Sequence, residues 1–233
     1  MNSPSPAGSI ILVHGAWADG SCWSSIILPL RRQGLNVISA PIPLTSLCDD
    51  VAALGRAIER TEGPVTLVGH AYGGAVISAV QDDRVESLVY VAALAPDEGE
   101  TVADVFYRTA PHAQAPHLQP DAHGYIWMPD EGFVHAVAHD ASPDQLAVMA
   151  AIQRPIAVQC IQEKAPFAAW KSTPSWYLVA EEDRMILVET QRFMARRMNA
   201  KIRPNKVDHS PMYSAPKLVM DVVLEAARVV NQQ

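Results

Sequence analysis

The segment from Val65 to Ile77, VTLVGHAYGGAVI, limits the fold of this chain more than any other feature. An apolar run ends in a glycine, and two further glycines open a second run of small and apolar residues. Glycine permits a tight turn and lets a helix pack closely on neighbouring strands. The segment therefore predicts a buried strand, a sharp turn and a helix.

The turn in this segment has the spacing of a nucleophile elbow, which is written G-x-S-x-G. Here it reads Gly69-His70-Ala71-Tyr72-Gly73, so both glycines are in place and alanine occupies the serine position. A methyl group cannot attack a carbonyl carbon. The sequence thus combines the backbone pattern of a nucleophilic turn with a side chain that has no nucleophile.

The rest of the chain alternates apolar strand patterns with helical ones. Such alternation is typical of an α/β fold with a mostly parallel sheet. We expect about six strands with helices on both faces of the sheet. The expected strands are 9–15, 36–41, 64–69, 85–94, 175–183 and 200–209, and the expected helices are 22–32, 47–60, 73–81, 188–198 and 218–230.

Residues 97–172 interrupt this alternation. They hold seven prolines and five of the eight histidines of the chain. Because strand patterns on both sides of the segment belong to one sheet, we interpret it as an inserted helical cap over the carboxyl ends of the strands. The whole chain, residues 1–233, is then a single domain.

Composition narrows the classes of partner and compartment. The net charge is 18 − 25 = −7, which argues against a nucleic-acid partner and against an anionic membrane surface. The start MNSPSPAGS lacks the basic and apolar regions of a signal peptide, so we expect a cytoplasmic protein. Cys22, Cys48 and Cys160 form no CxxC pair, and no cofactor motif is present, so we expect neither disulfides nor a cofactor.

Histidine spacing gives little reason to expect a metal. Only His135 and His139 of the cap are four residues apart, and no third ligand is indicated, so we expect no metal site.

Residues with catalytic side chains follow the expected fifth and sixth strands. Asp183 ends the segment SWYLVAEED, and His209 lies in VDHSP. Ligands of open parallel sheets bind outside the carboxyl ends of the strands, where both residues are expected. The order of elbow, acid and histidine is typical of a catalytic triad. Asp208 is expected at the surface, because neighbouring side chains of an extended segment point to opposite faces.

Taken together, these motifs resemble those of the small lidded α/β-hydrolases, in particular the branch of esterases and hydroxynitrile lyases. HGAWADGSCW matches the HGAxxxxxCW loop of that branch, and GHAYGGAV matches its GHSxGG except at the serine. The resemblance extends from Ile10 to the last helix. It implies the α/β-hydrolase fold.

The resemblance also implies roles for individual residues. Ala71 occupies the nucleophile position, Asp183 that of the triad acid and His209 that of the base. The backbone N–H groups of Ala16 and Tyr72 would form an oxyanion hole, which does not depend on the missing serine side chain.

Four aromatic and histidine side chains are candidates for substrate contact or for structural roles. Trp17 and Trp127 are candidates for substrate contact, although packing within the cap is an alternative for Trp127. His14 and His70 are expected to make structural hydrogen bonds.

Three interpretations of Ala71 remain open at this point. In the first, the chain is a serine esterase that carries an engineered Ser-to-Ala change. In the second, it is an enzyme in which a His209–Asp183 dyad acts alone on a small ester, lactone or other carbonyl compound, by hydrolysis or by lyase or oxygenase chemistry. In the third, it is a pseudoenzyme that binds a small apolar ligand under the cap. Histidine oriented by a carboxylate is a competent general base. The sequence specifies neither the substrate nor the oligomeric state. A homodimer is one of the states that it allows.

Overall fold

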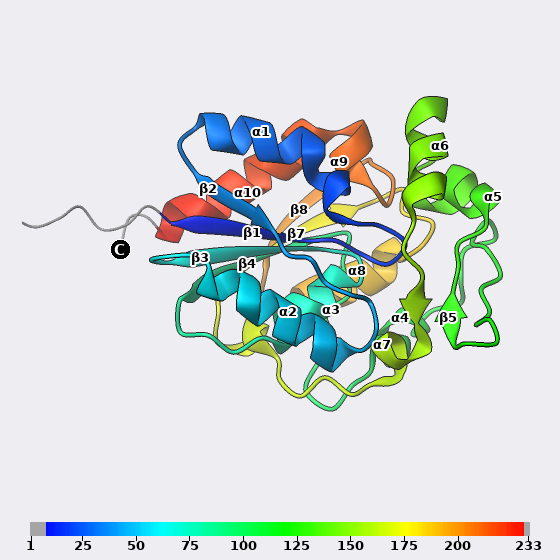
Figure 1. Cartoon of the computed structure of the whole chain (residues 1–233), viewed down its shortest axis with the longest axis horizontal. Coiled ribbons are helices and arrows are strands. Elements are labelled where there is room, and N and C mark those ends of the chain that lie inside the picture. Colours follow the sequence, from blue (N-terminus) through cyan, green and yellow to red (C-terminus); the bar gives the residue numbers. More distant parts are fainter. Residues whose placement is uncertain (1–7, 231–233) are drawn as a thin grey trace, which may run out of the picture.

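The computed structural model describes residues 8–230 and contains a six-stranded parallel sheet in the order β2-β1-β3-β4-β7-β8 (Figure 1). The predicted α/β-hydrolase fold is confirmed. Because every pairing in this sheet is parallel, the carboxyl ends of all six strands lie at one edge. The strands are β1 (Ser9–Val13), β2 (Asn36–Ser39), β3 (Val65–His70), β4 (Val85–Val91), β7 (Ser175–Ala180) and β8 (Lys201–Asn205).

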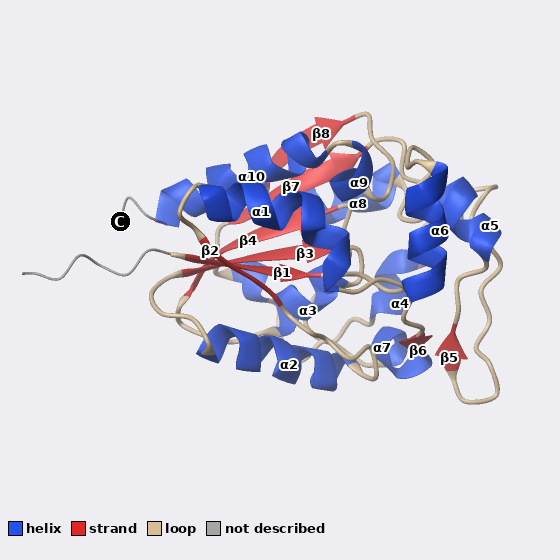
Figure 2. Ribbon diagram, turned by 45° about the horizontal axis from the view of Figure 1, so that its top comes forward, coloured by secondary structure: helices blue, strands red, loops and turns tan. Residues whose placement is uncertain are grey.

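Helices cover both faces of the sheet (Figure 2). One face packs against α2 (Leu47–Glu59), α3 (Gly73–Ala79) and α8 (Val188–Arg197). The other face packs against α1 (Ser24–Arg32) and α10 (Pro216–Val230), with the short α9 (Pro211–Ser214) beside them. Alternate residues of β3 join the two cores, because successive side chains of a strand point to opposite faces: Leu67 packs on the first and Val68 on the second.

Most expected elements are shifted or shortened by one to four residues, and two of these differences affect the surroundings of the site. The helix expected at 22–32 begins as a 3-10 turn, η1 (Gly20–Trp23), and Pro29 lies inside the α-helix that follows. The expected strand 200–209 ends at Asn205, so His209 lies in a loop beyond it. Pro204 is accommodated because β8 is an edge strand, where a missing N–H donor costs little.

The 97–172 segment, here called the cap segment, lies beside the carboxyl ends of the strands (Figure 1). Its elements are α4 (Val102–Phe106), β5 (Tyr125–Ile126), α5 (Asp130–Gly132), η2 (Phe133–Val137, a π-helical turn), α6 (Pro143–Ile152), β6 (Ile156–Ala157), α7 (Val158–Gln162) and η3 (Ala169–Lys171). β5 and β6 form a separate antiparallel pair. That residues 1–233 form a single domain with this segment as its cap stays a prediction.

The two ends of the cap segment are fastened to each other and to α8. Lys171 forms an ion pair with Asp97 at 2.5 Å, and the Trp170 indole N–H donates to the Pro96 carbonyl at 3.2 Å. Arg197 of α8 pairs with Glu100 at 2.8 Å. These contacts join the points where the chain leaves and re-enters the sheet.

The described residues include no helix that is long and apolar enough to span a membrane. Residues 1–7, on which the expectation about a signal peptide mainly depends, lie outside the described part of the chain.

Glycine spacing at the elbow generates a stability prediction. A Cβ on Gly73 would lie 2.5 Å from the Val13 carbonyl oxygen, so we expect Gly73→Ala to lower the free energy of unfolding. Overpacking of this kind costs about 1–3 kcal/mol. Gly55 of α2 is the matched control, because a Cβ there meets no atom within 4 Å. Gly55→Ala should raise the free energy by about 0.5–1 kcal/mol. Denaturant titration measures both; equal effects would contradict the close-approach argument.

Candidate active site

The structure brings Asp183 and His209 together at the carboxyl edge of the sheet. Asp183 follows β7 and His209 lies beyond β8, and the His209 Nδ1 atom is 2.8 Å from Asp183 Oδ2. Both side chains are almost fully buried. Because a carboxylate only accepts hydrogen bonds, Nδ1 carries the proton and Nε2 is left as the basic nitrogen.

Asp183 is held by several donors besides His209. Its Oδ1 atom accepts the backbone N–H groups of Met185 at 2.7 Å and Ile186 at 2.9 Å. Its Oδ2 atom also accepts the side-chain N–H of Gln191 at 2.8 Å. A carboxylate has several acceptor positions, so these donors and His209 can bind it together. The acid is therefore fixed in orientation by groups of the same turn and of α8.

The elbow has the strained backbone of a nucleophilic turn although it carries alanine. Ala71 lies directly after β3 with a φ of +48°, in the left-handed region that non-glycine residues rarely adopt. Such conformations cost about 1–3 kcal/mol and persist only where the surroundings enforce them. A Cβ on Gly69 would lie 2.6 Å from the Gly73 carbonyl oxygen, so glycine is required for this turn to close.

The two predicted oxyanion donors are free. Neither the Ala16 N–H nor the Tyr72 N–H donates to another group within residues 8–230. The loop that carries Ala16 is fixed by the next residue, Trp17, which has a φ of +57°. Its backbone N–H donates to the Arg154 carbonyl at 3.1 Å, and its indole N–H donates to the Ile126 carbonyl at 2.9 Å. Two hydrogen bonds thus join this loop to the cap segment.

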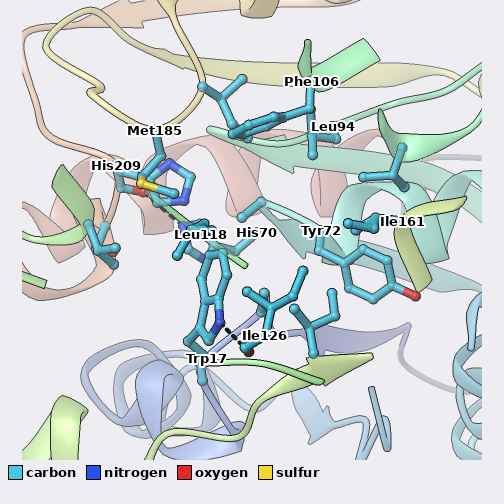
Figure 3. Close-up of a pocket in the computed structure, with 18 of the residues that line it drawn as sticks. Trp17, His70, Tyr72, Leu94, Phe106, Leu118, Ile126, Ile161, Met185 and His209 are labelled. Atoms are coloured by element: carbon cyan, nitrogen blue, oxygen red, sulfur yellow. Dashed lines mark hydrogen bonds between the residues drawn. The ribbon is translucent and has the colours of Figure 1, made fainter. Parts of the chain in front are cut away.

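One cavity of about 100 Å³ is lined by all of these residues: Ala71, Ala16, Tyr72, Trp17 and His209. Figure 3 shows the positions of Trp17, Tyr72 and His209 in its wall. A single water needs about 10–15 Å³, so the cavity can hold a small organic molecule. Its outer wall comes from the cap segment, which contributes among others Phe106, Leu118, Ile126, Phe133, Val137 and Met149. No aspartate, glutamate, lysine or arginine lies among the described residues of its lining.

His70 supports the loop of His209 as a neutral side chain. Its Nε2–H donates to the His209 carbonyl at 2.8 Å, and the two rings are 4.8 Å apart. Burial, and secondly the nearby His209, lowers the pKa of His70 to about 3. Burial likewise lowers the pKa of His14 to about 4, and its Nδ1–H donates to the Gly15 carbonyl. Both histidines make the structural hydrogen bonds expected of them.

Two residues are placed differently from the prediction. Trp127 does not line the cavity: its side chain is half exposed on the cap segment, where its indole N–H donates to Asp121 at 3.2 Å. A substrate contact by Trp127 has no support from the lining of this cavity and stays a prediction. Asp208 is fully buried rather than at the surface. The loop after β8 turns it inward, where it accepts hydrogen bonds from Ser210, Ser214 and the backbone of Asp140.

One group of possible metal ligands occurs among the described residues. Ligand atoms of His139, Asp140 and Glu182 lie within 4.8 Å of one another, but both acids are exposed and none of the three lines the cavity. The expectation that the protein uses no metal stays a prediction.

Sequence reasoning missed three buried residues of this region. Gln191 of α8 holds Asp183, as described above. Asp50 of α2 accepts the Tyr72 hydroxyl at 2.7 Å, and Cys160 of α7 lies 3.7 Å from the same carboxylate oxygen. Burial raises the pKa of the Asp50 carboxyl to about 6. Acidic residues such as Asp49 and Asp50 in the first turn of a helix interact favourably with the helix dipole, so their positions in the sequence give no sign of the Tyr72 contact.

A comparison with known protein families agrees with the resemblance that the sequence motifs indicated. Residues 10–222 match the Alpha/beta hydrolase family. The chain belongs to this family. Methylesterase 8 of Arabidopsis thaliana is 24% identical over 242 residues, which cover 93% of this chain and 88% of the plant protein.

Solved structures of other α/β hydrolases share the fold. A pyrethroid hydrolase from Sphingobium faniae JZ-2 superposes with a TM-score of 0.82 at 20% identity, covering 97% of this chain and 100% of that one. A variant of tomato Methylketone Synthase I complexed with beta-ketoheptanoate superposes with a TM-score of 0.81 at 18% identity, covering 96% and 99%.

Burial of neutral histidines in this α/β hydrolase generates a prediction about acid stability. The pKa of His14 falls from 6.5 to about 4 on folding. The unfolded chain therefore binds this proton first as the pH decreases, and stability is lost below about pH 6.5. His70 acts in the same direction. Asp50 acts in the opposite direction, because its raised pKa lets the native state bind a proton first.

We expect His14→Gln to reduce the loss of unfolding free energy between about pH 7.5 and about pH 5 by about 1–2 kcal/mol. Urea titrations at the two pH values measure the difference. Replacement of the exposed His123 by glutamine is the control and should leave the pH dependence unchanged. Identical pH dependence in both variants would contradict the burial of a neutral His14.

Proposed function

We propose that this α/β hydrolase hydrolyses small, uncharged esters or lactones with water as the nucleophile. His209 is the general base, Asp183 orients it, and the backbone N–H groups of Ala16 and Tyr72 form the oxyanion hole. The observation that carries the proposal is the buried His209–Asp183 hydrogen bond at a cavity that also contains the two free N–H groups and the serine-less elbow.

The proposed reaction needs one water and no covalent intermediate. His209 Nε2 takes a proton from the water while its oxygen bonds to the carbonyl carbon, and the carbonyl oxygen becomes an oxyanion held by the two N–H groups. The tetrahedral intermediate then breaks its bond to the leaving oxygen, which receives the proton from His209. Ala71, which lacks the serine hydroxyl, leaves room for the water at the elbow.

The lining of the cavity supports an uncharged substrate. Transfer of an ionised group into an apolar site without a partner is strongly unfavourable. Because no charged side chain lies among the described lining residues, a free carboxylic acid would have no cation to pair with. The apolar walls favour an aliphatic or aromatic substituent, with the carbonyl oxygen as the polar anchor.

Two alternatives for Ala71 are separated by experiment. A serine esterase disarmed by substitution needs the missing hydroxyl to form an acyl-enzyme, whereas a dyad enzyme does not. The similarity to a methylketone synthase bound to beta-ketoheptanoate adds a lyase acting on β-keto acids as a second reaction to assay, although the uncharged cavity favours esters.

His209→Ala should reduce ester hydrolysis by the unmodified chain by about 10²–10⁴-fold, the usual contribution of a general base. Hydrolysis of p-nitrophenyl acetate and of a small lactone measures the effect. His117→Ala, at an exposed site of the cap segment, is the control. Turnover that does not respond to His209→Ala would contradict the dyad, and turnover of a β-keto acid in place of esters would assign the protein to the lyase reaction.

Ala71→Ser tests whether the elbow has lost a nucleophile. In a disarmed serine esterase the added hydroxyl should give burst kinetics and labelling by a fluorophosphonate. Loss of a triad nucleophile costs about 10⁶ in kcat, so the gain should be very large. In the proposed dyad enzyme, serine fills the space of the water and hydrolysis of the natural substrate should not increase. A large gain confined to kcat would overturn the proposal. If both the unmodified chain and Ala71→Ser bind a ligand without turnover, the protein is a pseudoenzyme.

A further inference from the structure

Asp50 occupies a position that the proposed reaction does not use directly. It lies in the first turns of α2 with no exposed surface. Its Oδ1 atom accepts the Leu44 N–H at 2.7 Å, and its Oδ2 atom accepts the Tyr72 hydroxyl at 2.7 Å, with the Cys160 thiol 3.7 Å away. Within the described residues no lysine or arginine pairs with it. Burial of a carboxylate without a cation is unfavourable, so its hydrogen bonds must offset the cost of removing it from water.

The Tyr72 side chain connects Asp50 to the elbow. Tyr72 precedes the first residue of α3, follows the strained Ala71, and supplies one of the two proposed oxyanion donors. Its phenol extends away from His209, and its hydroxyl lies at the far end (Figure 3). At Gly73 the elbow packs directly against the backbone of β1. The Tyr72–Asp50 hydrogen bond joins the elbow to α2 as well.

The same carboxylate is connected to the cap segment. Leu44, whose N–H it accepts, has a φ of +62° and accepts the Ala157 N–H of β6 at 3.0 Å. Cys160 lies one turn further on, in α7. Asp50 therefore contacts Leu44, which is six residues before it, and two segments further away in the chain, those of Tyr72 and Cys160. Each of the three also reaches the cavity or the cap segment.

We propose that Asp50 is a positioning residue: by holding the Tyr72 hydroxyl it fixes the direction of the Tyr72 backbone N–H in the oxyanion hole. The inference rests on the proposed function, because it assigns a role within that site. Displacement of a reacting group by about 1 Å can cost about 10²-fold in rate, so a remote tether of this kind is expected to act on turnover.

Tyr72→Phe removes only the tether. We expect kcat for p-nitrophenyl acetate to fall about 10-fold or more, with KM unchanged. This decrease should be smaller than the one that follows loss of a whole oxyanion donor, which is about 10²–10³-fold. Tyr90→Phe is the matched control, since the Tyr90 hydroxyl is equally buried, is 2.9 Å from Ser78 Oγ and does not line the cavity. It should leave kcat unaltered.

Two substitutions of Asp50 separate tethering from bulk stability. Asp50→Asn retains an acceptor for the Leu44 N–H, and its amide can donate to the Tyr72 oxygen, so kcat should be largely rescued. Asp50→Leu has a similar volume and no polar atom, so kcat should fall as in Tyr72→Phe. Equal kcat in the two Asp50 variants and in Tyr90→Phe would overturn the proposal.

The carbonyl stretch of bound acetophenone gives a readout that needs no turnover. In the unmodified protein the hydrogen bonds of the oxyanion hole should shift the stretch to lower frequency, and Tyr72→Phe and Asp50→Leu should reduce this shift while Tyr90→Phe keeps it. If no ester is hydrolysed but the shift depends on Tyr72 and Asp50, the proposed function fails and the positioning role stands. If esters are hydrolysed and the shift is the same in every variant, or absent from the unmodified protein, the positioning role is overturned.

Discussion

The backbone of the elbow is the constraint on which the site depends. Ala71 keeps a φ of +48° because β1 and α3 approach each other too closely to accommodate side chains at the neighbouring glycines. Ala71 and Tyr72, the two residues at this turn, both line the same cavity. The strained turn is thus preserved without the hydroxyl that such turns usually present, and the backbone part of the site is independent of the missing side chain.

Burial then decides the protonation and orientation of the polar groups around the elbow. Four donors surround Asp183, which keeps the His209 ring in one tautomer. Desolvation lowers the pKa of His70 to about 3, so this side chain donates to the His209 carbonyl as a neutral ring. Neighbouring histidines therefore have different tasks, because one faces a carboxylate and the other a carbonyl oxygen.

In the proposed reaction, the cap segment selects the substrate and the residues at the sheet edge carry out the catalysis. It supplies apolar walls and no charged side chain among the described lining residues. Its carbonyls at Ile126 and Arg154 accept hydrogen bonds from Trp17, in the loop that carries Ala16. The identity of the substrate is therefore expected to follow from the shape of these walls, whereas the reaction follows from the sheet edge. This division explains how one fold accommodates relatives named as methylesterases and pyrethroid hydrolases.

The sequence by itself determined the alternation of strands and helices, the elbow, and the pairing of Asp183 with His209, because these follow from local periodicity and from the meeting of parallel strands at one edge. Only the tertiary structure decided that Trp127 faces away from the cavity, that Asp208 is buried, and that Gln191 and Asp50 hold the site. Those positions depend on the path of the loops after β7 and β8 and on the packing of α2 and α8 against the sheet edge. No local pattern of residues encodes that path or that packing.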